Sequence, residues 1–89
     1  MREIKVTRPD EEWLEKHGVR EWPIWTKDPS VFDWYYDSEE HCLILEGKVT
    51  VREGAQEVHL KPGDYVVFPK GLSCNWEVEE PVRKHYKFV

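Results

Sequence analysis

The chain has 89 residues, enough for one hydrophobic core and too few for a second. Its 18 acidic and 13 basic residues give a formal net charge of −5, and the basic residues are scattered, which argues against nucleic-acid binding. No stretch approaches the roughly 20 apolar residues that cross a bilayer, so we expect no membrane partner and a cytoplasmic protein. Abundant Glu and Lys beside only two side-chain amides fit growth at high temperature.

The N-terminal part predicts a short strand at residues 4–6 and then one short helix. Thr7 is the expected helix cap, and the acidic residues at 10–12 favour the first turn because they stabilise the positive end of the helix dipole. Gly18 offers the left-handed conformation that commonly ends a helix. The sequence predicts no other helix.

From residue 19 onward the hydrophobic pattern alternates with a period of two, which is typical of β-strands. The predicted strands cover residues 24–26, 31–36, 40–46, 48–52, 57–60, 65–68, 73–79 and 82–88. Because no second helix is available for parallel crossovers, eight short strands favour an antiparallel sandwich or barrel.

Two turns between these strands have a chemical explanation. Gly47 separates two strong strands and is expected to adopt a positive φ in a tight hairpin. Pro62 and Gly63 fit the two central positions of a type II turn, which favours glycine at the second.

Two motifs with a fixed glycine spacing stand in the strand-rich part. In the first, Glu40 is followed by six residues and Gly47; in the second, Gly63 is followed by five residues and then Pro69-x-Gly71. On these motifs the sequence resembles a cupin, and the resemblance covers roughly residues 30 to 78, more than half of the chain. The resemblance implies an all-β fold: a single-domain jelly-roll β-barrel of antiparallel strands with one short N-terminal helix, spanning residues 1–89.

A narrower likeness is carried by Trp22, Phe32, the Leu45-Glu46-Gly47 turn, the Phe68-Pro69-x-Gly71 loop and Trp76-Glu77-Val78 followed by Pro81-Val82-Arg83-Lys84. On these residues the sequence resembles the small cupins grouped with (S)-ureidoglycine aminohydrolase and the ethanolamine-utilisation proteins. This likeness implies an enzyme acting on a ureido, amino or amide-bearing metabolite.

The metal ligands of the metal-binding cupins are missing from this sequence. Two histidines should precede Glu40, and a third should follow the second motif. The positions they would take are Asp33 and Tyr35, or Trp34 and Tyr36, and then Cys74. A catalytic metal generally needs about three good ligands. His41 cannot replace a missing ligand beside Glu40, because neighbouring side chains of a strand point to opposite faces. We therefore expect no tightly bound metal or other cofactor, while weak binding of a divalent metal stays open.

The alternation of side chains nevertheless predicts a pocket inside the barrel. Glu40, Cys42 and Ile44 share one face of their strand, and the cupin register turns that face inward. The expected ligand-binding residues are Trp34, Tyr36, Cys42, Cys74 and Trp76. Such an aromatic box suits a small polar metabolite, and a desolvated Glu40 is the candidate catalytic residue, acting as a general acid or base.

Each of these residues also has a structural interpretation. Glu40 could form a hydrogen bond to Tyr36 or an ion pair with a lysine, the rings could fill the core, and both thiols could be small buried hydrophobic groups. The sequence thus leaves three functions open: an aminohydrolase-like enzyme, a metal-free metabolite-binding or sensory module, and a scaffold. Exposed strand edges and the many aromatic residues further predict a homodimer.

Overall fold

The strands and helices were located in a computed structural model, which describes residues 3–89. In chain order the elements are β1 (Lys5–Thr7), α1 (Glu11–Lys16), the 3-10 helix η1 (Val19–Glu21), β2 (Ile24–Lys27), β3 (Ser30–Tyr35), β4 (Glu40–Glu53), β5 (Gln56–Leu60), β6 (Tyr65–Phe68) and β7 (Ser73–Phe88). All strand pairings are antiparallel. The all-β fold with one short α-helix, predicted from the sequence, is confirmed.

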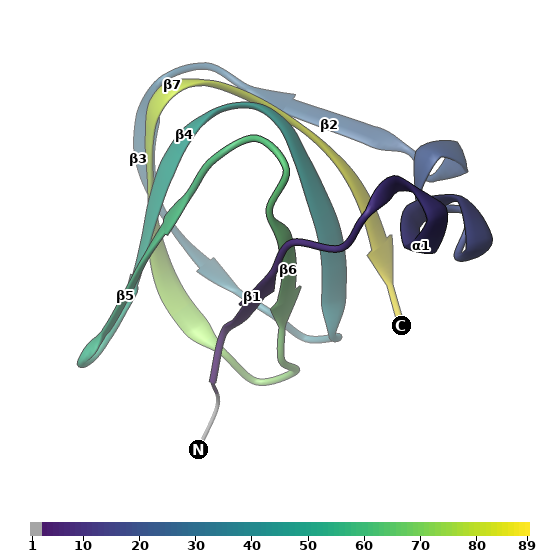
Figure 1. Ribbon diagram of the computed structural model, residues 1–89. Helices are drawn as coiled ribbons and strands as arrows, with labels where there is room; N and C mark the ends of the chain where they lie inside the picture. The colour runs from purple at the N-terminus through teal and green to yellow at the C-terminus, as the bar shows by residue number, and fades with distance from the viewer. Residues whose placement is uncertain (1–2) are drawn as a thin grey trace.

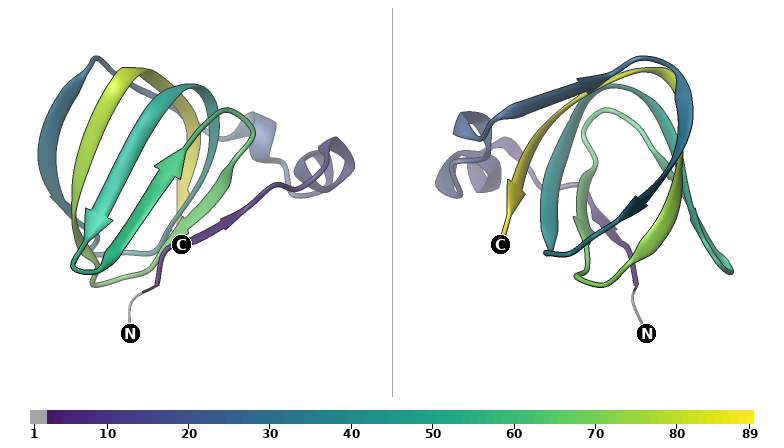
Figure 2. Two further views of the ribbon diagram at one scale, coloured as in Figure 1. Left: turned by 60° about the vertical axis from the view of Figure 1, so that its left-hand side comes forward. Right: turned by 180° about the vertical axis from the view of Figure 1, so that it is seen from behind.

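Two long strands, β4 and β7, run antiparallel along the whole sheet and bend with it (Figure 1). On the other side of β4, β6 pairs with its beginning and β5 with its end. Along the other side of β7, β3 pairs with its beginning and β2 with its end, while β1 extends the sheet beyond β6. The sheet therefore curls into a roll, as the two further views in Figure 2 show. Within residues 3–89 no pairing joins β2 or β3 to β1, β5 or β6, so the roll stays open on that side.

The predicted strand breaks at Gly47 and near Pro81 are wrong, because both residues lie inside long strands. Gly47 has the expected positive φ of 104°, but it marks a bulge rather than a hairpin, and the register of β4 against β7 shifts around it. A Cβ at Gly47 would lie 2.5 Å from the carbonyl oxygen of Pro81. Because glycine has no Cβ, the backbones of β4 and β7 can approach each other closely where both strands bend.

The turn around Pro62 and Gly63 agrees with the prediction. Gly63 has a φ of 96°, and the backbone N–H of Asp64 donates to the carbonyl of Lys61 over 3.1 Å. This turn brings β6 back onto β4.

The helix begins later than predicted, because Asp10 and not Thr7 is its cap. The Asp10 carboxylate accepts a hydrogen bond from the backbone N–H of Trp13 over 2.9 Å, whereas Thr7 ends strand β1. Gly18 follows the helix in the expected left-handed conformation, with a φ of 67°. Together α1 and η1 lie outside the roll (Figure 1).

The two faces of the curled sheet carry two separate hydrophobic cores. The inner core is the larger and contains Ile4, Tyr36, Cys42, Ile44, Val49, Val51, Leu60, Val66, Phe68, Leu72, Cys74, Trp76, Val78 and Val82. The outer core consists of Leu14, Val19, Leu43 and Tyr65, where the two helices cover β4 and β6. Side chains at consecutive positions of β4, such as Cys42 and Leu43, enter opposite cores because strand side chains alternate.

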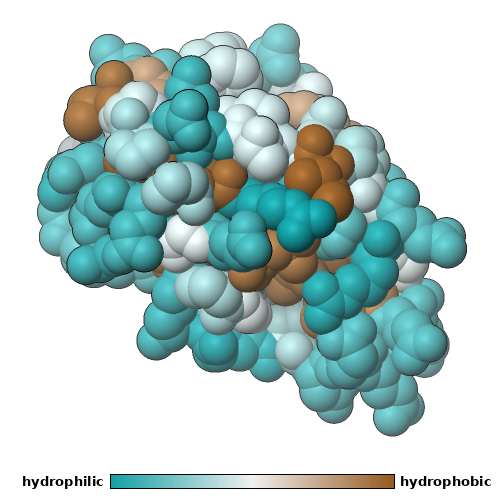
Figure 3. Space-filling view, turned by 90° about the horizontal axis from the view of Figure 1, so that it is seen from above, coloured by the Kyte–Doolittle hydropathy of each residue, from teal (hydrophilic) through white to brown (hydrophobic). Residues whose placement is uncertain are grey.

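The face of the molecule seen in Figure 3 is largely hydrophilic. Figure 3 shows one face on which small apolar patches lie between polar residues. Within residues 3–89, neither helix has the length and the apolar character that crossing a bilayer would take.

Candidate functional site

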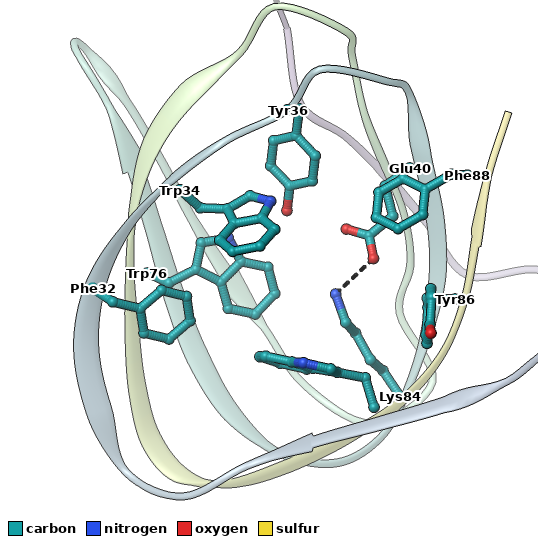
Figure 4. A pocket seen from close by; sticks show the side chains of 9 residues that line it. Phe32, Trp34, Tyr36, Glu40, Trp76, Lys84, Tyr86 and Phe88 are labelled. Carbon is teal, nitrogen blue, oxygen red and sulfur yellow. Dashed lines mark hydrogen bonds and ion pairs between the residues drawn. The ribbon is translucent and has the colours of Figure 1, made fainter.

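A cavity of about 180 Å³ opens into the roll on its inner face. Its walls come from β2, β3, β4 and β7 and the segment after β3. The lining residues are Trp25, Phe32, Trp34, Tyr36, Glu40, Trp76, Lys84, Tyr86 and Phe88. Seven of these nine are aromatic, and the other two are a carboxylate and an ammonium group (Figure 4).

Strand alternation explains how β7 supplies three of these side chains. Lys84, Tyr86 and Phe88 occupy every second position and share the inner face. His85, between them, turns outward, where its Nδ1 lies 2.9 Å from the backbone carbonyl oxygen of Trp22. The end of the chain therefore faces the cavity on one side and the helical cover on the other.

Glu40 and Lys84 form a buried ion pair in this cavity. The Nζ of Lys84 donates to Oε2 of Glu40 over 2.9 Å, and each side chain is only 5% exposed. In so dry a site the two charges have given up most of their hydration, and their mutual attraction offsets that loss. The pair is consequently sensitive to the removal of either member.

Aromatic rings also surround the Lys84 ammonium. Its Nζ lies 4.7 Å from the ring centroid of Trp76 and 4.9 Å from that of Trp25. At these distances the negative faces of the indoles attract a cation. The charge of Lys84 is thus held by one carboxylate and by at least two rings.

The hydroxyl of Tyr36 points into the same cavity (Figure 4). Burial raises the pKa of Tyr36 far above its ordinary value, and the negative charge of Glu40 adds to the effect. A side-chain hydrogen bond to Glu40 contributes in the same direction, so the phenol stays protonated and donates on the cavity side. Its ring stacks on Phe68, with centroids 4.8 Å apart, which fixes its direction.

The cavity has a buried floor and an accessible rim. Trp76 is 2% exposed and stacks on Phe32 at a centroid distance of 6.0 Å. Trp34 and Phe88, by contrast, are 49% and 48% exposed. A ligand would pass the two rim rings before it reached the polar pair.

The structure brings four of the six predicted site residues to this cavity: Glu40, Trp34, Tyr36 and Trp76. The two predicted sulfurs are not on its wall. Cys42 does point inward, but it is fully buried in the inner core beneath larger side chains. The thiol of Cys74 donates to the backbone carbonyl of Trp34 over 3.7 Å, and Cys74 lines a separate open groove.

Neither thiol has the character of a nucleophile. Burial raises the pKa of Cys42 to about 12 and that of Cys74 to about 11. Near neutral pH both are protonated, so they act as the small buried hydrophobic groups of the structural interpretation.

The sequence interpretation missed five lining residues: Trp25, Phe32, Lys84, Tyr86 and Phe88. Those of β7 carried a usable signal, because the alternation of the predicted strand 82–88 places positions 84, 86 and 88 on one face. What the sequence does not give is the register that sets β4 beside β7. An ion pair between Glu40 and a lysine was one predicted alternative, but Lys84 was not named as the partner.

The residues of the cavity do not fit the metal ion of the metal-binding cupins. Glu40 is the only carboxylate, imidazole or thiol among the lining residues, and its Oε2 is engaged by Lys84. In residues 3–89 no group of three or more His, Cys, Asp or Glu side chains is placed to hold a metal. The other lining residues are an ammonium group and aromatic side chains, which cannot supply the two further ligands that a catalytic metal would need.

The sequence matches the model of the EutQ-like cupin domain over residues 14–86. The chain belongs to this family of cupins. A search of curated proteins found no match.

Solved structures give the same result for the fold. A DUF861 family protein from Thermotoga maritima superposes with a TM-score of 0.95 at 52% identity, over 98% of this chain and all of that one. EutQ from Clostridium difficile superposes with a TM-score of 0.68 at 20% identity, over 73% of this chain and 52% of that one. A putative ethanolamine utilisation protein Q from Salmonella typhimurium gives 0.67 at 24% identity, over 96% and 68%. The last two likenesses concern the cupin fold alone.

Proposed function

We propose that this EutQ-like cupin binds a small, planar, neutral metabolite with adjacent N–H and C=O groups, such as an amide or a ureido compound, without a metal. The observation that carries the proposal is the buried Glu40–Lys84 pair, which forms the polar part of an otherwise aromatic cavity. Convergent polar groups in an apolar cavity are what small-molecule sites generally present.

The charges of the pair favour a neutral ligand. The carboxylate of Glu40 and the ammonium of Lys84 already compensate each other, so an added ionic group would leave a net charge in a buried, largely aromatic site. A ligand N–H can donate to Glu40, while its carbonyl oxygen accepts from Lys84 or from the Tyr36 hydroxyl. The amide group matches both halves of the pair at once.

The walls and the size of the cavity favour a flat ligand of about one ring. Aromatic walls offer stacking surfaces, as the Phe32–Trp76 pair does for its own rings. An engineered cavity of about 150 Å³ is known to admit benzene, so the 180 Å³ found in this protein suits a ligand of similar size.

Benzamide is a suitable probe, with methyl benzoate as the matched compound that lacks N–H donors. We expect benzamide to quench the fluorescence of the cavity tryptophans and to bind more tightly than methyl benzoate. Glu40→Gln should weaken benzamide binding at least about tenfold, because a hydrogen bond to a charged group is lost. Glu46→Gln, an exposed change on the same strand, is the control. Equal binding of the two compounds, or unchanged binding by Glu40→Gln, would overturn the proposal.

Proton transfer by Glu40 is a second candidate function. It is favoured by the position of the carboxylate, which faces the cavity beside one ammonium and one phenol donor. Aminohydrolase-type chemistry on a ureido compound would use such groups to activate water and to protonate the departing amine. The test is ammonia release from small neutral amides and ureas, benzamide among them, which Glu40→Gln should abolish. Benzamide binding without any ammonia release would leave a metabolite-binding or sensory module.

We also propose that two copies pair through the open edge of β3. This strand is hydrogen-bonded only to β7 among the described strands, and Val31 and Tyr35 on it are 67% and 60% exposed. Sedimentation velocity over a concentration series should show a dimer that Tyr35→Lys dissociates. A 10.7 kDa species at all concentrations would contradict the pairing.

A further inference from the structure

Lys84 differs from every other lysine of the protein in its surroundings. The other seven, at positions 5, 16, 27, 48, 61, 70 and 87, are exposed. Lys84 is 4% exposed, lines a cavity, and has a carboxylate oxygen 2.9 Å from its Nζ. A buried lysine amine beside a proton acceptor, in a cavity that admits a small molecule, is the arrangement used for covalent attack on carbonyl compounds.

We propose that Lys84 forms a reversible imine with small aldehydes or ketones that enter this cavity. The substrate class is a neutral carbonyl compound of about one ring, since charge and volume restrict it as they restrict the amide ligand. The inference uses the same cavity as the proposed function and adds a covalent activity to it.

Glu40 is positioned to move the protons that the reaction requires. The carboxylate first takes a proton from the Lys84 ammonium, which frees the nitrogen lone pair. The nitrogen attacks the carbonyl carbon, the C=O π electrons pass to oxygen, and a proton moves from nitrogen to that oxygen to give a carbinolamine. Glu40 then returns its proton to the hydroxyl, the C–O bond breaks, and water leaves as the C=N bond forms. The balance is ammonium plus carbonyl compound giving protonated imine plus water.

The contacts around Lys84 suit the product as well as the starting ammonium. A protonated imine carries the same single positive charge at the same nitrogen. The Glu40 carboxylate and the indole faces of Trp25 and Trp76 therefore continue to stabilise it. Cyanoborohydride then reduces the protonated imine and makes the adduct permanent.

Tyr36, on the cavity wall, can orient the carbonyl group of the substrate for the attack. The hydroxyl of Tyr36 points into the cavity and stays protonated, so it can donate to the carbonyl oxygen on which negative charge develops. Lys84 and Tyr36 then approach the same C=O group, one at carbon and the other at oxygen.

Reductive trapping tests the proposal on the intact protein. The protein is incubated at neutral pH with benzaldehyde and sodium cyanoborohydride, and benzylated lysines are located by peptide mass mapping. The seven exposed lysines set the background rate of labelling. We expect Lys84 to be labelled at least about 100-fold faster than this background, the lower end of what a positioned acid–base group contributes. Benzamide should protect Lys84 by competition.

Variants and the benzamide titration separate the possible results. Lys84→Met should lose the fast labelling, whereas Lys87→Met, on the outer face of the same strand, should retain it. Mapping on the unchanged protein decides the question even if Lys84→Met fails to fold. If benzamide binds but Lys84 is labelled no faster than surface lysines, the imine proposal is overturned and the amide-binding function stands. If neither compound interacts, both are overturned.

Discussion

The inner and outer faces of the curled sheet both carry ion pairs, but their surroundings differ. On the outer face, Arg52 contacts Glu57 and Glu77 at 2.8 and 2.7 Å, and its side chain is 44% exposed. On the inner face, Lys84 contacts Glu40 at 2.9 Å and both side chains are 5% exposed. The distances are nearly equal, so it is burial that distinguishes the two sites.

Burial changes what each pair contributes. Water and salt screen the Arg52 network, so each of its contacts adds little to stability. The inner pair is unscreened, and its two members depend on each other for compensation. Because burying two charges costs free energy, a role in the cavity explains the inner pair better than a contribution to stability does.

The largest effect is expected from breaking the inner pair on one side. Lys84→Met should lower the free energy of unfolding by about 3–5 kcal/mol, because it leaves the Glu40 carboxylate buried without its partner. Urea denaturation of the variant and of the unchanged protein measures this difference. A loss no greater than that of an exposed change such as Lys87→Met would show that water reaches Glu40 freely.

Removing both charges should recover most of that loss. In Glu40→Leu with Lys84→Met, apolar side chains of similar volume replace the pair, and we expect an unfolding free energy within about 1–2 kcal/mol of the original. The double-mutant cycle gives the coupling between the two residues directly. Additive losses would contradict a specific pairing.

Raising the pH should lower the free energy of unfolding, because the inner face buries acids that are uncharged in the folded protein. Cys42, Cys74 and Tyr36 all have raised pKa values in the folded protein, so between the unfolded and folded values the folded state holds more protons. Their contribution to stability is complete below about pH 9 and is lost as the pH rises beyond it. Unfolding free energies measured from pH 8 to 10.5 should therefore fall.

Burial of the two thiols also predicts their reactivity. Neither thiol should react with Ellman's reagent at pH 8 until urea unfolds the chain.

The outer face should show the smallest response. Arg52→Met should leave the melting temperature nearly unchanged, and any small loss should disappear in concentrated salt. Thermal scans at low and high ionic strength check this expectation. A loss comparable to that of Lys84→Met would contradict the contrast between the two faces.

The sequence predicted the fold and part of the site for an identifiable physical reason. Alternation predicted the strands and placed Glu40 on one face with Cys42 and Ile44, and the resemblance to cupins implied that this face points inward. The pattern could not show that Gly47 and Pro81 only bend their strands, because a positive φ serves a bulge as well as a hairpin. It also could not pair Glu40 with Lys84, because that contact depends on a register between residues 44 positions apart in the chain.

The course of β4 and β7 has a consequence for how the molecule comes apart. Every other strand except β1 is hydrogen-bonded to one of these two, and β1 joins through β6. Neither half of the roll can peel away while the other persists, since both halves are made from the same pair of strands. The amide protons that are hydrogen-bonded between strands should therefore exchange together in a single global opening, with only β1 and the helical turn free to fray on their own.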